Sequence, residues 1–207
     1  MKPDFTLYLI TDRKLFTSSK NMLEAIEDVL AGGVKAVQLR EKDLGVRELL
    51  ELAQHLRGVT REYGARLFIN DRLDVALAVD ADGVHLGRGS MPVQAVRKVS
   101  EGTMTIGVSA HSVIEAKQAA QDGADFITLG PVYETPSKLQ YGMPIGLGVL
   151  REAVMCTSLP VFAIGGIRME RVHEVLQQGA SGVALISAIL GAEDVRRTTK
   201  EFMRELS

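Results

Sequence analysis

The stretch "AGGVKAVQLREKD", residues 31–43, passes from two glycines through an apolar segment into four consecutive charged residues. Glycines at this place are typical of a turn between a helix and a strand. The apolar segment lacks strict polar alternation, which is typical of a parallel strand covered on both faces. A strand that ends in charges indicates either a surface loop or a binding site at its carboxyl end.

The same pattern returns three more times along the chain. "VDADGVH", "DGADFIT" and "QGASGVA" also place glycine and small residues before an apolar run. Together with the apolar runs that lie between these repeats, the chain has eight candidate strands, at residues 7–11, 36–40, 66–70, 83–87, 104–110, 126–132, 161–166 and 182–188. Amphipathic stretches such as 21–33 and 46–64 lie between most of them and predict helices. The sequence therefore predicts an α/β fold, the (β/α)8 TIM barrel, with short helices after the third and fourth strands.

Length and composition limit the class of protein. The chain has 207 residues, of which 46% are hydrophobic, and this fits a single barrel domain over residues 1–207. A formal net charge of -2 provides no overall basic field, so we expect no nucleic-acid or membrane partner. The lone cysteine and the lack of an apolar leader predict a cytoplasmic protein. The apolar residues of "LGVLREAVM", 147–155, are candidates for a homodimer contact.

Polar side chains gather where the predicted strands end. In parallel barrels the functional face lies at the carboxyl ends of the strands. The strand ends carry, in chain order, Gln38, Arg40, Lys42, Asn70, Asp71, Arg72, His85, Arg88, Ser90, Ser109, His111, Thr135, Ser137 and Lys138. Side chains alternate along a strand, so Gln38, Arg40 and Lys42 lie on one side. These three donors suit a diphosphate or a carboxylate, and a surface cluster of ion pairs is the alternative.

The last two predicted strands end instead in "AIGGI" and "LISAI", residues 163–167 and 185–189. Glycines let backbone N–H groups approach an anion, and a helix N-terminus adds a partial positive charge. The two segments together predict a phosphate cradle. The alternative is a tight turn at Gly165 and Gly166 and a helix cap at Ser187.

Three further positions allow two interpretations each. Asp71 can bind Mg²⁺ beside a diphosphate, or it can cap the helix that begins in "RLDVALAV". Lys138 lies in "ETPSKLQYG", which resembles either a lid over a ligand or a plain loop. His85 and His111 are candidates for an acid or base, or for hydrogen-bonded structure.

Seven segments in order resemble the thiamine phosphate synthase/TenI family: "QLREKD", "INDR", "DGVHLG", "GVSAHS", "DGADFITLGPVYETPSK", "AIGGI" and "GVALISAI". The resemblance covers nearly the whole chain. It implies a barrel that binds a pyrimidine diphosphate and a thiazole phosphate and joins them into thiamine phosphate. The implied reaction is dissociative, so the protein neutralises the leaving diphosphate and positions two substrates. No side-chain nucleophile is required.

The resemblance implies a role for each matched position. Contacts to the aminopyrimidine diphosphate are implied for Gln38, Arg40, Lys42, Asn70 and Lys138, with Ser109 close to the pyrimidine. Arg40, Lys42 and Lys138 are the implied catalytic residues, because they neutralise the leaving group. The implied thiazole phosphate site consists of Thr135, Ser137, Gly166, Ile186 and Ser187. Mg²⁺ is the implied cofactor, with Asp71 as its ligand.

The segment "HLGRGSMP", residues 85–92, departs from the synthase pattern. Arg88 stands in place of Gln, Gly89 in place of an acidic residue, and Ser90 in place of a second metal-binding Asp. A serine hydroxyl is a poor magnesium ligand, so Asp71, diphosphate oxygens and water would hold the metal. We hypothesise that Arg88 supplies part of the missing positive charge to the diphosphate.

"GSMP" resembles the TenI branch of the family, whose members isomerise a thiazole phosphate carboxylate. The catalytic histidine that this branch can carry is replaced here by Pro131. The retained Gln38, Lys42 and Asp71 favour the synthase. A thiazole tautomerase and a catalytically silent barrel that binds thiamine precursors are the alternatives.

Overall fold

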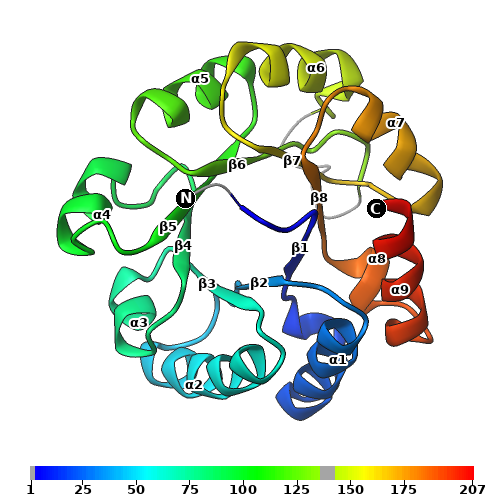
Figure 1. The fold of residues 1–207 in the computed structure, drawn as a ribbon. Helices are drawn as coiled ribbons and strands as arrows, with labels where there is room; N and C mark the ends of the chain where they lie inside the picture. The colour runs from blue at the N-terminus through cyan, green and yellow to red at the C-terminus, as the bar shows by residue number, and fades with distance from the viewer. Residues whose placement is uncertain (1–2, 136–142) are drawn as a thin grey trace.

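The computed structural model describes residues 3–135 and 143–207, and its strands close into a parallel barrel in sequence order (Figure 1). The strands are β1 (Leu7–Ile10), β2 (Ala36–Leu39), β3 (Arg66–Asn70), β4 (Gly83–Leu86), β5 (Thr105–Ala110), β6 (Phe126–Leu129), β7 (Val161–Ile164) and β8 (Gly182–Leu185). Pairing of β8 with β1, with Leu7 opposite Val183, closes the barrel. Each apolar run of the sequence holds one strand, so the predicted (β/α)8 barrel is confirmed.

Helices form a ring around the outside of the barrel (Figure 1). They are α1 (Ser19–Ala31), α2 (Val46–Glu62), α3 (Leu73–Ala78), α4 (Val93–Val99), α5 (Val113–Gln121), α6 (Gly146–Cys156), α7 (Val172–Gln177), α8 (Ser187–Leu190) and α9 (Val195–Glu205). α3 and α4 have six and seven residues, which confirms the short helices predicted after the third and fourth strands. Within residues 3–135 and 143–207, no helix is both long and apolar enough to cross a lipid bilayer.

The repeated turn before the even-numbered strands depends on one backbone conformation. Gly33, Asp80, Gly123 and Gly179 have φ values of 111°, 50°, 89° and 88°, and each lies three residues before a strand begins. A left-handed residue just after a helix ends the helix and turns the chain. Glycine adopts this conformation without a steric penalty, and aspartate is among the residues that tolerate it. The repeat seen in the sequence is therefore a repeated left-handed turn.

Apolar side chains form two separate cores. The larger core lies between the barrel and its helices and includes Leu39 of β2. The smaller core fills the barrel with the rings of Phe5, Tyr8, Phe68, Phe126 and Phe162, whose neighbouring centroids are 5.0 to 6.4 Å apart. Such aromatic pairs stabilise a core beyond the area that they bury. Because Phe5 precedes β1, this aromatic plug occupies the amino-terminal side of the barrel and leaves the carboxyl side for polar groups.

Candidate functional site

A layer of polar side chains lies on the carboxyl side of the aromatic plug. Nε2 of Gln38 donates a hydrogen bond to the hydroxyl of Tyr8 at 3.1 Å, and this hydroxyl lies 3.5 Å from Nδ1 of His85. Nε2 of His85 lies 3.0 Å from Oγ of Ser109 and 3.3 Å from Oγ1 of Thr128. The structure thus brings Gln38 and Ser109 into one network, through side chains that lie between them.

The two candidate histidines at the strand ends are both held by hydrogen bonds. Burial, assisted by the positive charge of Arg40, lowers the pKa of His85 to about 3, so its imidazole is neutral at physiological pH. Nδ1 of His111 lies 2.6 Å from the carbonyl oxygen of Gly130. These contacts favour the structural interpretation of both histidines over a role as acid or base.

The two acids that follow β2 join its loop to the loop after β1. Glu41 is buried and accepts hydrogen bonds from Oγ1 of Thr11 at 2.6 Å and from the backbone N–H of Arg13 at 3.1 Å. Burial raises the pKa of the Glu41 carboxyl, against these hydrogen bonds, which lower it. Asp43 pairs with the Arg13 guanidinium at 2.9 Å. Both acids therefore bind residues of the loop after β1 and hold the two loops together.

Arg40 and Lys42 have no acidic partner among the residues that the structure describes. Arg40 is half-buried, and its backbone N–H donates to Oγ1 of Thr11 at 2.9 Å. Its positive charge contributes to the lowered pKa of His85. Lys42 is exposed. No ion pair joins the four charged residues 40–43 to one another, so the alternative of an ion-pair cluster within this segment is wrong. β2 ends at Leu39 and Lys42 lies in the turn that follows, so the alternation predicted to align Gln38, Arg40 and Lys42 does not extend to Lys42 as a strand. A role of Arg40 and Lys42 in binding an anion stays a prediction.

Asp71 follows β3 in a left-handed conformation, with φ of 69°. Its backbone N–H donates to the carbonyl oxygen of His85 at 2.9 Å, which fixes the turn against β4. The N-cap of α3 is Arg72, with no side-chain cap, so the alternative role of Asp71 as a helix cap is wrong. The Asp71 side chain is exposed, and its carboxylate has no hydrogen bond or ion pair with a described residue. Asn70, at the end of β3, is half-buried.

The donor set fits Mg²⁺ held jointly by protein and substrate. Among the described residues, no group of three or more His, Cys, Asp or Glu side chains could hold a metal alone. Mg²⁺ in phosphate-binding sites usually takes one or two carboxylates, with phosphate oxygens and water as the other ligands. The uncommitted Asp71 carboxylate follows β3, the strand next to β2, after which Arg40 and Lys42 lie, so these residues are compatible with such a site.

The loop after β4 is closed by the serine that replaces the second metal ligand of the family pattern. Oγ of Ser90 accepts a hydrogen bond from the backbone N–H of Gly87 at 2.6 Å, and the Ser90 N–H donates to the Gly87 carbonyl at 3.1 Å. Arg88 is exposed and pairs with Glu115 of α5 at 3.2 Å. Such exposed pairs contribute about 0–1 kcal/mol, so a diphosphate can compete with Glu115 for Arg88. The role of Arg88 stays a prediction.

The glycines after β7 bring two loops together. Gly165 and Gly166 have φ values of 96° and 65°, and a Cβ on Gly166 would lie 2.5 Å from the carbonyl oxygen of Glu134. The backbone N–H of Tyr133 donates to the carbonyl of Gly165 at 3.1 Å. The tight turn at these glycines is thus observed, and the phosphate cradle stays a prediction beside it.

The other predicted thiazole phosphate contacts lie around the ends of β6 and β8. Ser187 is the exposed first residue of α8, whose N-cap is Ile186 without a side-chain hydrogen bond, so the helix-cap alternative for Ser187 is wrong. Ile186 packs against the apolar interior of the barrel. Thr135 is half-buried. Ser137 and Lys138 lie outside the described residues.

Sequence reasoning missed Tyr8, Thr11 and Thr128 as parts of the site. Each is a hydroxyl within or directly after an apolar strand run, in "LYLIT" or "FITL". A hydroxyl buried in a barrel needs a hydrogen-bond partner, so this signal was available in the sequence. The sequence does not indicate which residues bind these hydroxyls, because those residues lie on other strands.

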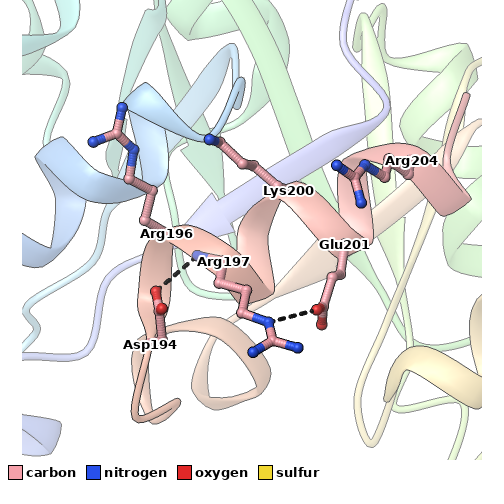
Figure 2. A pocket seen from close by; sticks show the side chains of 6 residues that line it. All are labelled: Asp194, Arg196, Arg197, Lys200, Glu201 and Arg204. Carbon is pink, nitrogen blue, oxygen red and sulfur yellow. Dashed lines mark hydrogen bonds and ion pairs between the residues drawn. The ribbon is translucent and has the colours of Figure 1, made fainter.

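One pocket, of about 540 Å³, lies away from the strand ends, on α9 in the outer ring (Figures 1 and 2). It is lined by Asp194, Arg196, Arg197, Lys200, Glu201 and Arg204. Figure 2 shows Asp194 bound to the backbone of Arg197, at 2.9 Å, and the Arg197 side chain paired with Glu201, at 3.0 Å. These contacts stabilise an exposed helix, and the pocket contains none of the barrel-mouth residues.

Comparison with known proteins places this geometry in a family. The sequence profile described as "Thiamine monophosphate synthase" matches residues 7–189. A protein of Geobacter sulfurreducens is 50% identical over 98% of this chain and 94% of its own length. The thiamine-phosphate synthase of Pyrococcus furiosus is 44% identical over 96% of this chain and 93% of its own. A solved structure of thiamine phosphate pyrophosphorylase from Pyrococcus furiosus, 42% identical, has a TM-score of 0.88 and covers 98% of this chain and 95% of that chain.

Proposed function

Because this chain belongs to the thiamine monophosphate synthase family, we propose that it is the transferase that joins an aminopyrimidine diphosphate to a thiazole phosphate. The products are thiamine phosphate and diphosphate. The observation that supports this most is the pair of unneutralised cations, Arg40 and Lys42, at the carboxyl end of β2. A tautomerase that binds only a thiazole phosphate has no evident use for them beside a free Asp71 carboxylate.

The reaction requires charge neutralisation and positioning. The bond between the pyrimidine methylene carbon and the diphosphate oxygen breaks, and its electron pair leaves with the diphosphate. The exocyclic ring amine stabilises the cation that remains, and the thiazole nitrogen donates its lone pair to form the new C–N bond. We assign neutralisation of the leaving group to Arg40, Lys42 and Lys138, since preorganised charges at the developing anion lower the barrier.

Asp71 would hold Mg²⁺, which when bound adds positive charge on the diphosphate oxygens. Asn70, at the same strand end, would contact the diphosphate. Arg88 would leave Glu115 and turn to the diphosphate, as hypothesised above.

The neutral barrel interior suits a cationic intermediate. A protonated His85 would repel the pyrimidine cation, and burial prevents this protonation at physiological pH. The aromatic plug below His85 closes the amino-terminal side of the barrel to water. Exclusion of water favours capture of the cation by the thiazole nitrogen over hydrolysis.

The thiazole phosphate would bind at the ends of β6, β7 and β8. We assign its phosphate to the backbone of Gly166 and Ser187, with Ile186 beside the ring and Thr135 and Ser137 as hydroxyl donors. We further propose that the chain acts in the cytoplasm, as one barrel domain, and as a homodimer in which Met155 of α6, 76% exposed, is an apolar contact.

The proposed function is tested by incubating the protein with the pyrimidine diphosphate, the thiazole phosphate and Mg²⁺. We expect thiamine phosphate, detected by oxidation to a fluorescent thiochrome, with release of one diphosphate per product. An ultraviolet change with the thiazole phosphate carboxylate alone, and no thiochrome, would mean the tautomerase. Thermal stabilisation by the ligands without either signal would mean the silent binder.

A second prediction concerns the missing metal ligand at Ser90. The change Ser90→Asp adds a carboxylate near the proposed Mg²⁺ site, so the Mg²⁺ concentration for half-maximal activity should fall about tenfold. Ser90→Asn is the matched control, because it keeps an oxygen that can accept from Gly87 N–H but adds no charge. If the two variants have the same magnesium dependence, Ser90 does not limit metal binding.

A further inference from the structure

Polar side chains from four strands form one chain across the barrel interior. The chain runs from Gln38 on β2 through Tyr8 on β1 and His85 on β4 to Ser109 on β5, with contacts of 3.1, 3.5 and 3.0 Å. Gln38, Tyr8 and His85 are at most 2% exposed, so water does not compete for their hydrogen bonds. Each of these groups must therefore form its hydrogen bonds with the neighbouring side chains of this network.

The direction of every hydrogen bond follows from the first one. The Nε2 amide of Gln38 can only donate, so the Tyr8 hydroxyl accepts from it and has its own hydrogen left to donate. Among the described residues, the other partner of this hydroxyl is Nδ1 of His85, which therefore accepts. A neutral imidazole whose Nδ1 accepts carries its hydrogen on Nε2. That hydrogen is donated to Oγ of Ser109, with Oγ1 of Thr128 as a second, longer contact at 3.3 Å.

The Ser109 hydroxyl, as an acceptor from His85, keeps its own hydrogen for another group. Ser109 is half-buried and is the second-last residue of β5, toward the carboxyl ends of the strands, where the functional face of a parallel barrel lies. We propose that Tyr8 and His85 are positioning residues that set the direction of this chain, so that Ser109 presents an O–H donor to an unprotonated ring nitrogen of the substrate. This inference deepens the proposed function and rests on it for the identity of the ring, the aminopyrimidine.

The opposite direction would have a different chemical consequence. With hydrogen on Nδ1, His85 would donate to Tyr8, and its Nε2 would accept from Ser109. Ser109 would then offer only a lone pair, which suits an N–H or an amine of the substrate. The tautomer of His85 therefore decides which edge of a heteroaromatic ring Ser109 can recognise.

The tautomer is measured directly by ¹⁵N NMR of the full chain, labelled at histidine, without substrates. The chain has four histidines, and loss of one signal in His85→Gln identifies His85. We expect hydrogen on Nε2 in the parent and in the control Thr128→Val, and a mixture of tautomers in Tyr8→Phe. Hydrogen on Nδ1 in the parent, or an unchanged tautomer in Tyr8→Phe, would overturn the proposal.

Kinetic measurements then test whether the hydrogen-bond chain from Gln38 to His85 affects substrate binding through Ser109. Loss of one neutral hydrogen bond costs roughly tenfold in affinity, so Ser109→Ala should raise KM for the pyrimidine diphosphate about tenfold with kcat little changed. Tyr8→Phe should raise KM similarly in the parent, but by less than about twofold in the Ser109→Ala background. Equal increases in both backgrounds would mean that Tyr8 acts by general stability alone.

If the Tyr8→Phe protein does not fold, a second pair of variants, at His85, tests the same proposal. His85→Gln keeps an amide donor for Ser109 and should retain most of the affinity, whereas His85→Leu should behave like Ser109→Ala. Identical losses in the two variants would contradict the proposal. If the chain forms no thiochrome product, the same comparisons are made by calorimetric binding of the pyrimidine diphosphate. The NMR result is independent of activity, so failure of this inference is distinguishable from failure of the proposed function.

Discussion

Replacement of Arg40 by alanine is expected to lower kcat/KM for the pyrimidine diphosphate about 100-fold, the loss typical of one preorganised charge at a developing anion. Arg40 is half-buried, its backbone is fixed by Thr11, and no described residue neutralises it. Its charge is therefore available to the diphosphate without first breaking an ion pair. Because charge accumulates on the leaving oxygen, kcat should fall more than KM rises. Steady-state thiochrome assays at saturating Mg²⁺ measure both constants.

The matched control removes one positive charge from the pocket on α9, away from the barrel mouth. Arg204 lines the pocket on α9 (Figure 2), so Arg204→Ala tests whether that pocket takes part in catalysis. We expect no change in kcat/KM for this variant. Arg40→Lys should lie between parent and alanine, because lysine restores the charge but not the two-pronged geometry of arginine. Similar losses in Arg40→Ala and Arg204→Ala would refute the placement of the diphosphate beside β2.

The fold was predictable because its signals are local. Each strand is an apolar run of four to six residues, and the turn before the even-numbered strands needs one left-handed residue at a set distance. Both features depend on residues only a few positions apart. Asp80 shows the limit of reading such a repeat by glycine alone, since it takes the left-handed place where the other three repeats have glycine.

The sequence indicated which polar residues follow the strands, but it did not indicate the hydrogen-bond partner of each one. Alternation along β2 indicates that Gln38 and Leu39 face opposite sides, and the structure agrees: Gln38 bonds to Tyr8 inside the barrel, and Leu39 packs in the larger core. It does not indicate that Gln38 donates to Tyr8, 30 positions earlier in the chain, because that contact exists only when β1 and β2 pair. Spacing likewise does not indicate that the Glu41 carboxylate accepts a hydrogen bond from Thr11. A charged run can be located from spacing, but its ion pairs depend on neighbouring loops.

Asp71 shows how a backbone detail changes the interpretation of a side chain. The sequence allowed a helix cap or a metal ligand. A cap needs an extended residue directly before the helix, and Asp71 is instead left-handed and one residue too early, before Arg72. This conformation leaves its carboxylate exposed and uncommitted. The geometry thus supports the metal-ligand role.

The change Asp71→Asn is expected to lower kcat about 100-fold at millimolar Mg²⁺, because it removes the carboxylate that would hold the metal against the diphosphate. The amide keeps the size of the side chain and suits the left-handed backbone, since asparagine tolerates this conformation as well as aspartate does. The protein should therefore stay folded. A magnesium titration should show partial recovery at high metal concentration, since diphosphate oxygens and water still bind the ion.

Asp74→Asn is the control for this change. Asp74 lies three positions later, and its carboxylate is already bound by the Arg72 guanidinium, at 2.9 Å from Nε. It is exposed like Asp71, so the two variants remove the same charge from nearby surface positions. Only loss of a metal ligand makes their magnesium titrations differ. If Asp74→Asn raises the magnesium requirement as much as Asp71→Asn does, the effect is one of surface charge, and Asp71 does not bind the metal.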